Sequence, residues 1–189
     1  MSAARESEIL DAALALLARE GISGVSMRAV AREAGLSLGL ANYYFTDKHG
    51  LITAALERIA DADAAIVEPH PDRDPESNLR RALRLVAAEE FLGLDYLALR
   101  LQLWSLAGVH DDYAAINRRA QAAYLDGLRS LLAAARPDLT EAAVRSRAED
   151  ILVIQNGVWL TSVLIPDDAT MHRAVARTEA IAFEGSAGT

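Results

Sequence analysis

The sequence has no cysteine and a single lysine, Lys48, among its 189 residues. Without cysteine, neither a disulfide framework nor a thiolate metal site can form. There is also no run of about 20 apolar residues, because the most apolar stretch, 151–165, is shorter and holds four polar side chains. The N-terminus lacks the order of charged, apolar and small residues that marks a signal peptide. We therefore expect a cytoplasmic protein with no membrane partner.

Positive charge is scarce as well. The formal net charge is −8 and the sequence pI is near 5.0, which excludes a generally basic surface for nucleic acid. Within residues 1–50 the basic residues are Arg5, Arg19, Arg28, Arg32 and Lys48, and the acidic ones are Glu6, Glu8, Asp11, Glu20, Glu33 and Asp47. Any contact with DNA must therefore be local, made by helix N-termini, hydroxyl groups and a few cations.

The alternation of apolar and polar residues that marks a β-strand is missing, and no internal repeat occurs. Apolar residues instead recur at helical spacing in nine segments: 2–20, 27–34, 38–44, 48–67, 79–87, 94–107, 113–132, 140–165 and 171–181. Three prolines and three acidic residues in 68–75 predict a loop. The sequence thus predicts an all-α protein of about nine helices.

The most informative stretch is SMRAVAREAGLSLGLANYYFTDKHGL, residues 26–51. Ser26 is suited to cap one short helix, and Ser37 is suited to cap a second over 38–44. Gly35 stands between them, where a left-handed residue ends a helix. Because the joint is only about three residues long, the two helices must cross steeply, which is the geometry of a helix-turn-helix.

The stretch resembles the DNA-binding region of the TetR (tetracycline repressor) family of bacterial regulators. The positions that match the family pattern are Arg28, Ala31, Ala34, Gly35, Ser37, Gly39, Phe45 and Lys48. Two positions depart from it, since Asn42 stands where the family often has Tyr and Tyr44 where it often has His. The resemblance implies a DNA-binding domain over 1–47 and a larger helical domain over 48–189 for effector binding and dimerisation.

Several side chains around the turn are candidates for DNA contact. They are Ser26, Arg28, Ser37, Leu38, Gly39, Asn42, Tyr43, Tyr44 and Lys48. On the resemblance, Arg28 and Lys48 would touch phosphates. The side chain of an Asn such as Asn42 has one donor and one acceptor, which can pair with N7 and N6 of adenine at the same time. The alternative is an ordinary helical surface, with one of the two tyrosines packed inward beside Phe45.

Large or polar side chains on otherwise apolar helices are candidates for the effector pocket that the family's larger domain contains. They are Gln102, Trp104, Tyr124, Asn156 and Trp159. Core packing is the alternative for each aromatic residue, because burial of a large ring needs no ligand. Buried amides need partners, and a second subunit could also supply them.

The helix predicted over 140–165 is apolar nearly all round from Ile151 onward, so it must be covered on two sides. Gly157 lies inside it, where glycine lowers helix stability and suggests close approach of another helix. By resemblance, this is the segment that forms the dimer's four-helix bundle. The alternative is that glycine occurs at position 157 by chance. The predicted interface residues are Ile151, Gln155, Gly157, Val158 and Val175.

Catalytic motifs are absent: the four histidines fall on different predicted elements, and there is no phosphate loop, metalloprotease motif or nucleophile elbow. We therefore predict no enzyme activity, no metal and no cofactor. The function predicted is that of a homodimeric, ligand-responsive repressor bound to a palindromic operator. The alternative is a helical sensor or interaction protein whose DNA-binding surface has degenerated.

Overall fold

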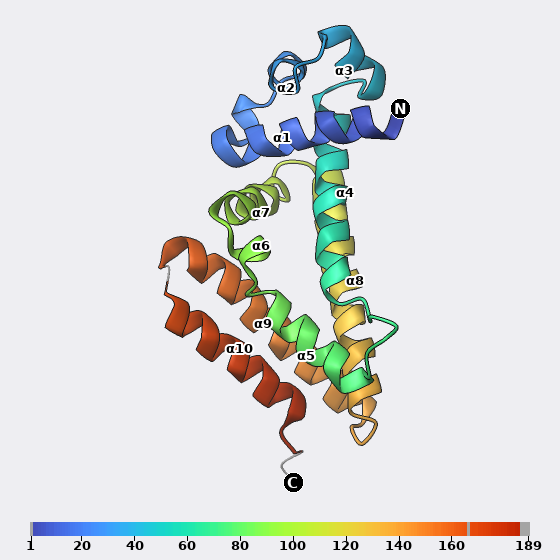
Figure 1. Cartoon of the computed structure of the whole chain (residues 1–189), viewed down its shortest axis with the longest axis vertical. Coiled ribbons are helices and arrows are strands. Elements are labelled where there is room, and N and C mark those ends of the chain that lie inside the picture. The colour runs from blue at the N-terminus through green and yellow to red at the C-terminus, as the bar shows by residue number, and fades with distance from the viewer. Residues whose placement is uncertain (1, 166, 186–189) are drawn as a thin grey trace. The chain divides into compact units, whose positions relative to one another are not determined.

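The computed structural model describes residues 2–165 and 167–185 (Figure 1). Within these ranges there are ten helices and no strand, which confirms the all-α class. The helices are α1 (Ser2–Gly24), α2 (Met27–Glu33), α3 (Leu38–Tyr44), α4 (Lys48–Ile66), α5 (Pro75–Leu85), α6 (Glu89–Leu92), α7 (Leu94–Leu106), α8 (Asp111–Ala135), α9 (Glu141–Leu164) and α10 (Asp168–Phe183). The helix not predicted is α6, a single turn of four residues. None of the described helices combines the length and the apolar character that crossing a membrane requires.

The chain forms two compact units, each built from two stretches of sequence. The first unit consists of the residues up to 61 together with 94–118, and the second consists of 62–93 and the residues from 119 onward. The units divide at three points, which lie inside α4, between α6 and α7, and inside α8. The physical reason is that α7 packs against α1, which places a distant stretch of sequence in the N-terminal unit.

The first unit has α1 at its centre, with α2 and α7 on opposite sides of it (Figure 1). Ile9, Leu16 and Leu17 of α1 are buried, and side chains from α2, α4 and α7 complete the same core. Burying each large aliphatic side chain stabilises the fold by about 1.5 to 3 kcal/mol. The pair α2–α3 therefore rests on a packed base.

The predicted end of the first helix at Gly21 corresponds to a break within α1. Gly21 has φ 67° and ψ −174°, a conformation that side-chain-bearing residues rarely adopt, and one more turn follows it up to Gly24. The break reverses the chain toward Ser26 and so sets the start of α2.

The second unit is built from α5, α9 and α10, with the later part of α8. Asp74, Thr140 and Asp167 cap α5, α9 and α10 through side-chain oxygens that accept backbone N–H bonds. At the other end of α10, Arg147 donates to the carbonyl of Ile181 at 2.9 Å, and Arg136 donates to the carbonyl of Ala182 at 3.0 Å. Cations at a helix C-terminus bind the carbonyls that have no partner within the helix.

Candidate nucleic-acid interface

The turn between α2 and α3 has the geometry that its sequence predicts. The Ser26 hydroxyl accepts from the amide of Ala29 at 3.1 Å, and the Ser37 hydroxyl accepts from the amide of Leu40 at 3.1 Å. Gly35 has φ 66°, in the left-handed region. The amide of Leu36 donates to the carbonyl of Ala31 at 2.9 Å, the bond that closes a Schellman motif. The predicted caps and the predicted left-handed glycine are thus confirmed.

Replacing Gly35 with alanine is expected to destabilise the turn by about 1 to 2 kcal/mol, the cost of a β-carbon in the left-handed conformation. No atom lies within 4 Å of the added carbon, so the cost comes from the backbone alone. The matched control is Gly50→Ala in the first turn of α4, where φ is not positive and the added carbon meets its nearest atom at 3.6 Å, an ordinary contact, so this change should not destabilise the protein. Thermal unfolding followed by circular dichroism measures both, and equal shifts would contradict the strain argument.

The outer face of α3 is open to solvent. Leu38, Gly39 and Asn42 are exposed, and Tyr43 is 80% exposed. Tyr44 differs, because it is half-buried and packs against the core of the first unit, with its ring edge-on to Tyr43 at 5.3 Å between centroids. Of the two tyrosines, Tyr44 is therefore the one that packs inward beside Phe45.

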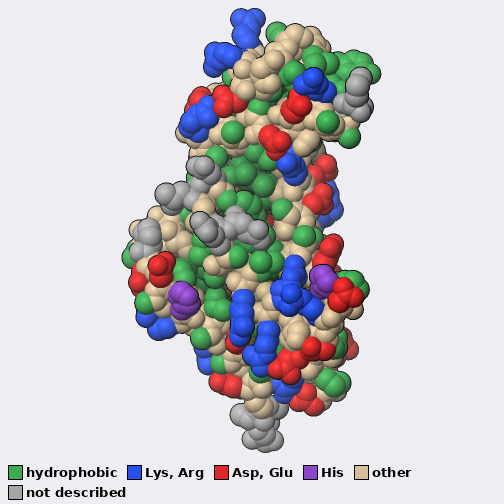
Figure 2. All heavy atoms as spheres, in the orientation of Figure 1, with side chains coloured by type: hydrophobic (Ala, Val, Ile, Leu, Met, Phe, Trp, Pro, Cys, Tyr) green, Lys and Arg blue, Asp and Glu red, His purple; other side chains and the backbone are tan. Residues whose placement is uncertain are grey.

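The cations of the first unit differ in how they are paired. Arg19 bonds both Glu20 and Glu33, and these hydrogen bonds, that to Glu33 first, raise the pKa of its guanidinium. Arg28 and Arg32 are exposed, lie one turn apart on α2 and make no ion pair with any described residue. Over the upper part of Figure 2, basic and acidic side chains are interspersed. Arg32 was not among the predicted contacts, although its spacing from Arg28 places it on the same helix face.

By resemblance, Lys48 was expected to touch a phosphate. The structure supplies an internal partner instead: the Lys48 ammonium donates to the carbonyl of Ile22 at 2.5 Å, and the side chain is half-buried. This bond ties the start of α4 to the end of α1. A lysine near a helix N-terminus can thus be satisfied by a carbonyl that only the tertiary fold brings close, and contact of Lys48 with phosphate stays a prediction.

Comparison with known proteins decides the family. The family model for bacterial regulatory proteins of the tetR family matches residues 9–55, which contain α2, α3 and most of α1. The regulator BetI of Burkholderia ambifaria is 28% identical over 164 residues, covering 85% of this chain and 82% of its own. A solved TetR-family member from Streptomyces coelicolor A3 is 27% identical with a TM-score of 0.69, covering 94% of this chain and 97% of its own. The chain belongs to the TetR family.

A more distant solved structure has the same fold. A transcriptional regulator from Saccharomonospora viridis, solved in complex with choline, is 19% identical with a TM-score of 0.77 and covers 97% of this chain and 98% of its own. Family membership makes this protein a DNA-binding transcriptional regulator with a helix-turn-helix. The assignment accounts for the exposed face of α3 and the unpaired arginines of α2.

The residues predicted for the effector pocket of this TetR-family protein are divided between the two units. Gln102 and Trp104 lie on α7 in the first unit, whereas the other three lie in the second. Tyr124 is buried and donates to Gln155 Oε1 at 3.0 Å, and Trp159 is buried and donates to the carbonyl of Val86 at 3.0 Å. These two contacts favour core packing for Tyr124 and Trp159.

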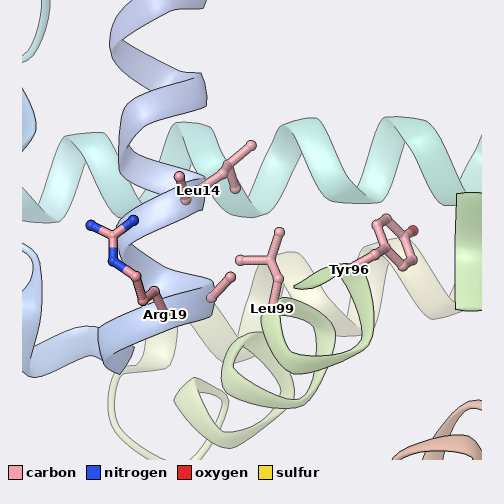
Figure 3. Close-up of a pocket in the computed structure, with 6 residues that line it drawn as sticks. Leu14, Arg19, Tyr96 and Leu99 are labelled. Carbon is pink, nitrogen blue, oxygen red and sulfur yellow. The ribbon is translucent and has the colours of Figure 1, made fainter. Parts of the chain in front are cut away.

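Two cavities are lined by other residues. One, of about 430 Å³, lies between α1 and α7 in the first unit and is lined by Leu14, Ala15, Ala18, Arg19, Tyr96 and Leu99 (Figure 3). Its walls are mostly apolar, and the guanidinium of Arg19 points away from Leu99 (Figure 3). The other, of about 340 Å³, lies in the second unit between α5, α6 and α10 and is lined by Arg84, Ala87, Leu92, Asp168, Met171, His172 and Val175.

Most of the residues predicted for the dimer interface face the interior of the second unit. Ile151, Gln155 and Val158 are buried within the second unit, so they face its own core and cannot reach a partner. Only Gly157 of the α9 set is exposed, and a β-carbon there would meet no atom within 4 Å. The exposed apolar residues of the same helix are Val153, Leu160 and Leu164. The all-round apolar pattern of α9 did not tell its inner face from its outer one.

A second cluster of polar groups in the first unit escaped the sequence analysis. His49 Nδ1 lies 3.0 Å from the Tyr113 hydroxyl, and His49 Nε2 lies 3.2 Å from Asp112 Oδ2. His110 stacks beside both rings. Burial raises the pKa of the Tyr113 phenol, and the charges of Asp47 and Asp112 raise it further. No linear motif reveals the cluster, because 60 residues separate its two halves; only the H-x-D-Y run at the start of α8 hints at it.

Proposed function

We propose that the protein is a ligand-responsive repressor that binds a palindromic operator as a homodimer. The observation that carries the proposal is the outer surface of α2 and α3. It combines two serine-capped helix N-termini, an exposed amide at Asn42 and two exposed arginines without ion pairs. These are the groups by which a protein of net negative charge can hold DNA locally.

We assign base recognition to α3 and phosphate contact mainly to α2. With α3 in the major groove, the Asn42 amide faces base edges, where it pairs with N6 and N7 of adenine. Arg28 and Arg32 on α2 lie beside it and contact phosphates, which carry no sequence information. Tyr43, exposed at the end of α3, adds a hydroxyl for phosphate.

The second copy docks on the outer face of α9. Val153, Gly157, Leu160 and Leu164 are spaced by four, three and four residues, so they form one stripe along the helix. The exposed fractions of Val153, Leu160 and Leu164 are 71%, 44% and 67%, large for apolar side chains on one helix. The open space at Gly157 lets a partner helix approach closely. The operator half-sites for such a dimer lie in successive major grooves about 34 Å apart.

An effector is assigned to the second unit because two amide atoms there are buried without a partner. Gln155 Nε2 and Asn156 Oδ1 make no hydrogen bond with any described residue, although Gln155 is fully buried. Buried amides need partners, and a polar ligand supplies them. The structurally similar S. viridis regulator was solved with choline, so small-molecule binding fits this fold. The effector must bind the DNA-free state better, or it shifts no equilibrium.

Two substitutions distinguish base recognition from phosphate contact. Asn42→Ala is expected to cost about 1 to 3 kcal/mol on the operator and little on random DNA, because it removes a base contact. Arg28→Ala is expected to weaken binding to both DNAs alike and to lower the salt slope by about one contact per subunit. Fluorescence anisotropy on operator and random duplexes across a salt series measures both effects.

Lys48→Ala is the control, because its ammonium bonds Ile22 and should alter the salt slope less than Arg28→Ala does. Equal losses of specificity in the Asn42 and Arg28 variants would contradict the assignment of roles. A parent protein that is dimeric yet shows no preference for any intergenic sequence would instead support the degenerate sensor.

A further inference from the structure

The first unit holds a constellation that DNA binding does not use. His49 stands in the first turn of α4, His110 directly precedes α8, and Asp112 lies in the first turn of α8. One ligand atom from each of the three lies within 4.8 Å of the others. Both segments belong to the same compact unit.

We propose that His49, His110 and Asp112 form a binding site for a divalent transition-metal ion of the zinc class. Asp112 Oδ2 lies 3.2 Å from His49 Nε2 and 3.7 Å from His110 Nδ1. Zinc held at 2.0 to 2.2 Å by nitrogen and oxygen in a tetrahedron separates its ligand atoms by roughly 3.3 Å. These two distances bracket that value and the two histidine nitrogens lie within 4.8 Å of each other, so side-chain rotations can bring the three atoms onto one ion.

The donor types decide which ion fits. Two imidazole nitrogens and one carboxylate oxygen suit Zn²⁺ and its late first-row neighbours, whereas Mg²⁺ and Ca²⁺ prefer oxygen ligands. Three protein ligands leave at least one position for water. A hollow of about 290 Å³ formed by residues 107–111 opens beside His110, and the His49 and His110 side chains are 42% and 50% exposed. An ion therefore has a path from solvent.

A supporting contact fixes the first ligand. The Tyr113 hydroxyl lies 3.0 Å from His49 Nδ1 and can accept a hydrogen bond from Nδ1–H, which leaves the Nε2 lone pair directed at the ion. The Tyr113 ring also stacks on the His49 ring, with centroids 5.0 Å apart and 30° between planes. His49 is thus held in its orientation from two sides.

One existing bond competes with the ion. His110 Nδ1 accepts from the Asp112 amide at 3.3 Å, near the upper limit for such a bond. This amide lies in the first turn of α8, where it has no helical partner and can bond to water instead. Its loss therefore costs little when the nitrogen turns to a metal.

The test uses the full chain without a polyhistidine tag, stripped of metal and titrated with Zn²⁺ by calorimetry. We expect one ion per chain and a higher melting temperature with Zn²⁺. His49→Gln, His110→Gln and Asp112→Asn should each weaken binding by more than about 100-fold, beyond the range of outer contacts. Tyr113→Phe, which keeps the ring, should weaken it by about 10-fold.

His70→Gln is the matched control, because His70 lies 3.8 Å from Asp72 as a histidine–carboxylate pair without a second histidine. Its effect on Zn²⁺ affinity should be negligible. No Zn²⁺ binding, or binding that the His70 change weakens as much as the His110 change does, would overturn the site. The ring resonances of the parent's four histidines give an answer that does not depend on variants folding. Zn²⁺ should shift those of His49 and His110, and shifts confined to the other two would refute the proposal.

Discussion

Leu160→Glu is expected to convert the protein from dimer to monomer at low micromolar concentration and to reduce operator affinity with it. Leu160 lies in the middle of the outer stripe of α9, where it is 44% exposed in the single chain. In the proposed dimer it is covered, so glutamate would place an unpaired charge in an apolar contact, at a cost of about 3 to 5 kcal/mol. That corresponds to a loss of more than about 100-fold in dimer affinity. Light scattering with operator titration measures both effects.

Two further variants make this result specific. Val109→Glu adds the same charge at an apolar residue that is 69% exposed in the loop before α8, and it should leave the dimer intact. Gly157→Leu should dissociate the dimer without unfolding the chain, because a β-carbon at this exposed position meets no atom of the protomer within 4 Å. A dimer that survives both Leu160→Glu and Gly157→Leu would rule out this face of α9.

Trp159→Ala is expected to lower the free energy of unfolding by about 3 to 5 kcal/mol, the range for removing a buried large aromatic side chain. Trp159 is 2% exposed, and its ring N–H donates to the carbonyl of Val86 at 3.0 Å. Trp159→Phe keeps most of the volume and loses the hydrogen bond, so its cost should be smaller, about 1 to 3 kcal/mol. Urea unfolding of the whole chain at one fixed protein concentration measures both, since dimerisation adds to apparent stability.

Trp104→Ala is the control for this series. Trp104 is half-buried on α7, with the Arg100 guanidinium 5.5 Å from its ring, so its replacement removes less buried area and should cost less. A Trp159→Ala variant that unfolds like the parent but no longer responds to effector would show that this ring contacts a ligand, as the sequence first suggested.

The boundaries that sequence predicted well are those set by hydrogen bonds within a few residues. Ser26 and Ser37 cap α2 and α3 through amides three residues on, and Gly35 adopts the left-handed conformation between them. Such bonds need only the local chain, so residue type and spacing predict them without knowledge of the tertiary fold.

The sequence patterns predicted less well which surface of a helix packs against another helix. Ile151, Gln155 and Val158 were predicted to face a partner, yet they face the second unit's own core. Because α9 is apolar nearly all round, its periodicity has no preferred side, and only packing against α10 shows that Gly157 and Leu160 face outward. In the same way, the composition of α7 could not show that it packs on α1 in the N-terminal unit.

The sequence by itself determined the all-α class, the helix-turn-helix and the family, because each depends on short-range periodicity, capping residues and the spacing of one motif. Only the tertiary structure decided that Lys48 bonds the carbonyl of Ile22, which lies 26 residues away. It alone brought His49 to Asp112, 63 residues away. Contacts of this length depend on how helices cross and not on the residues beside each group, so no local pattern records them.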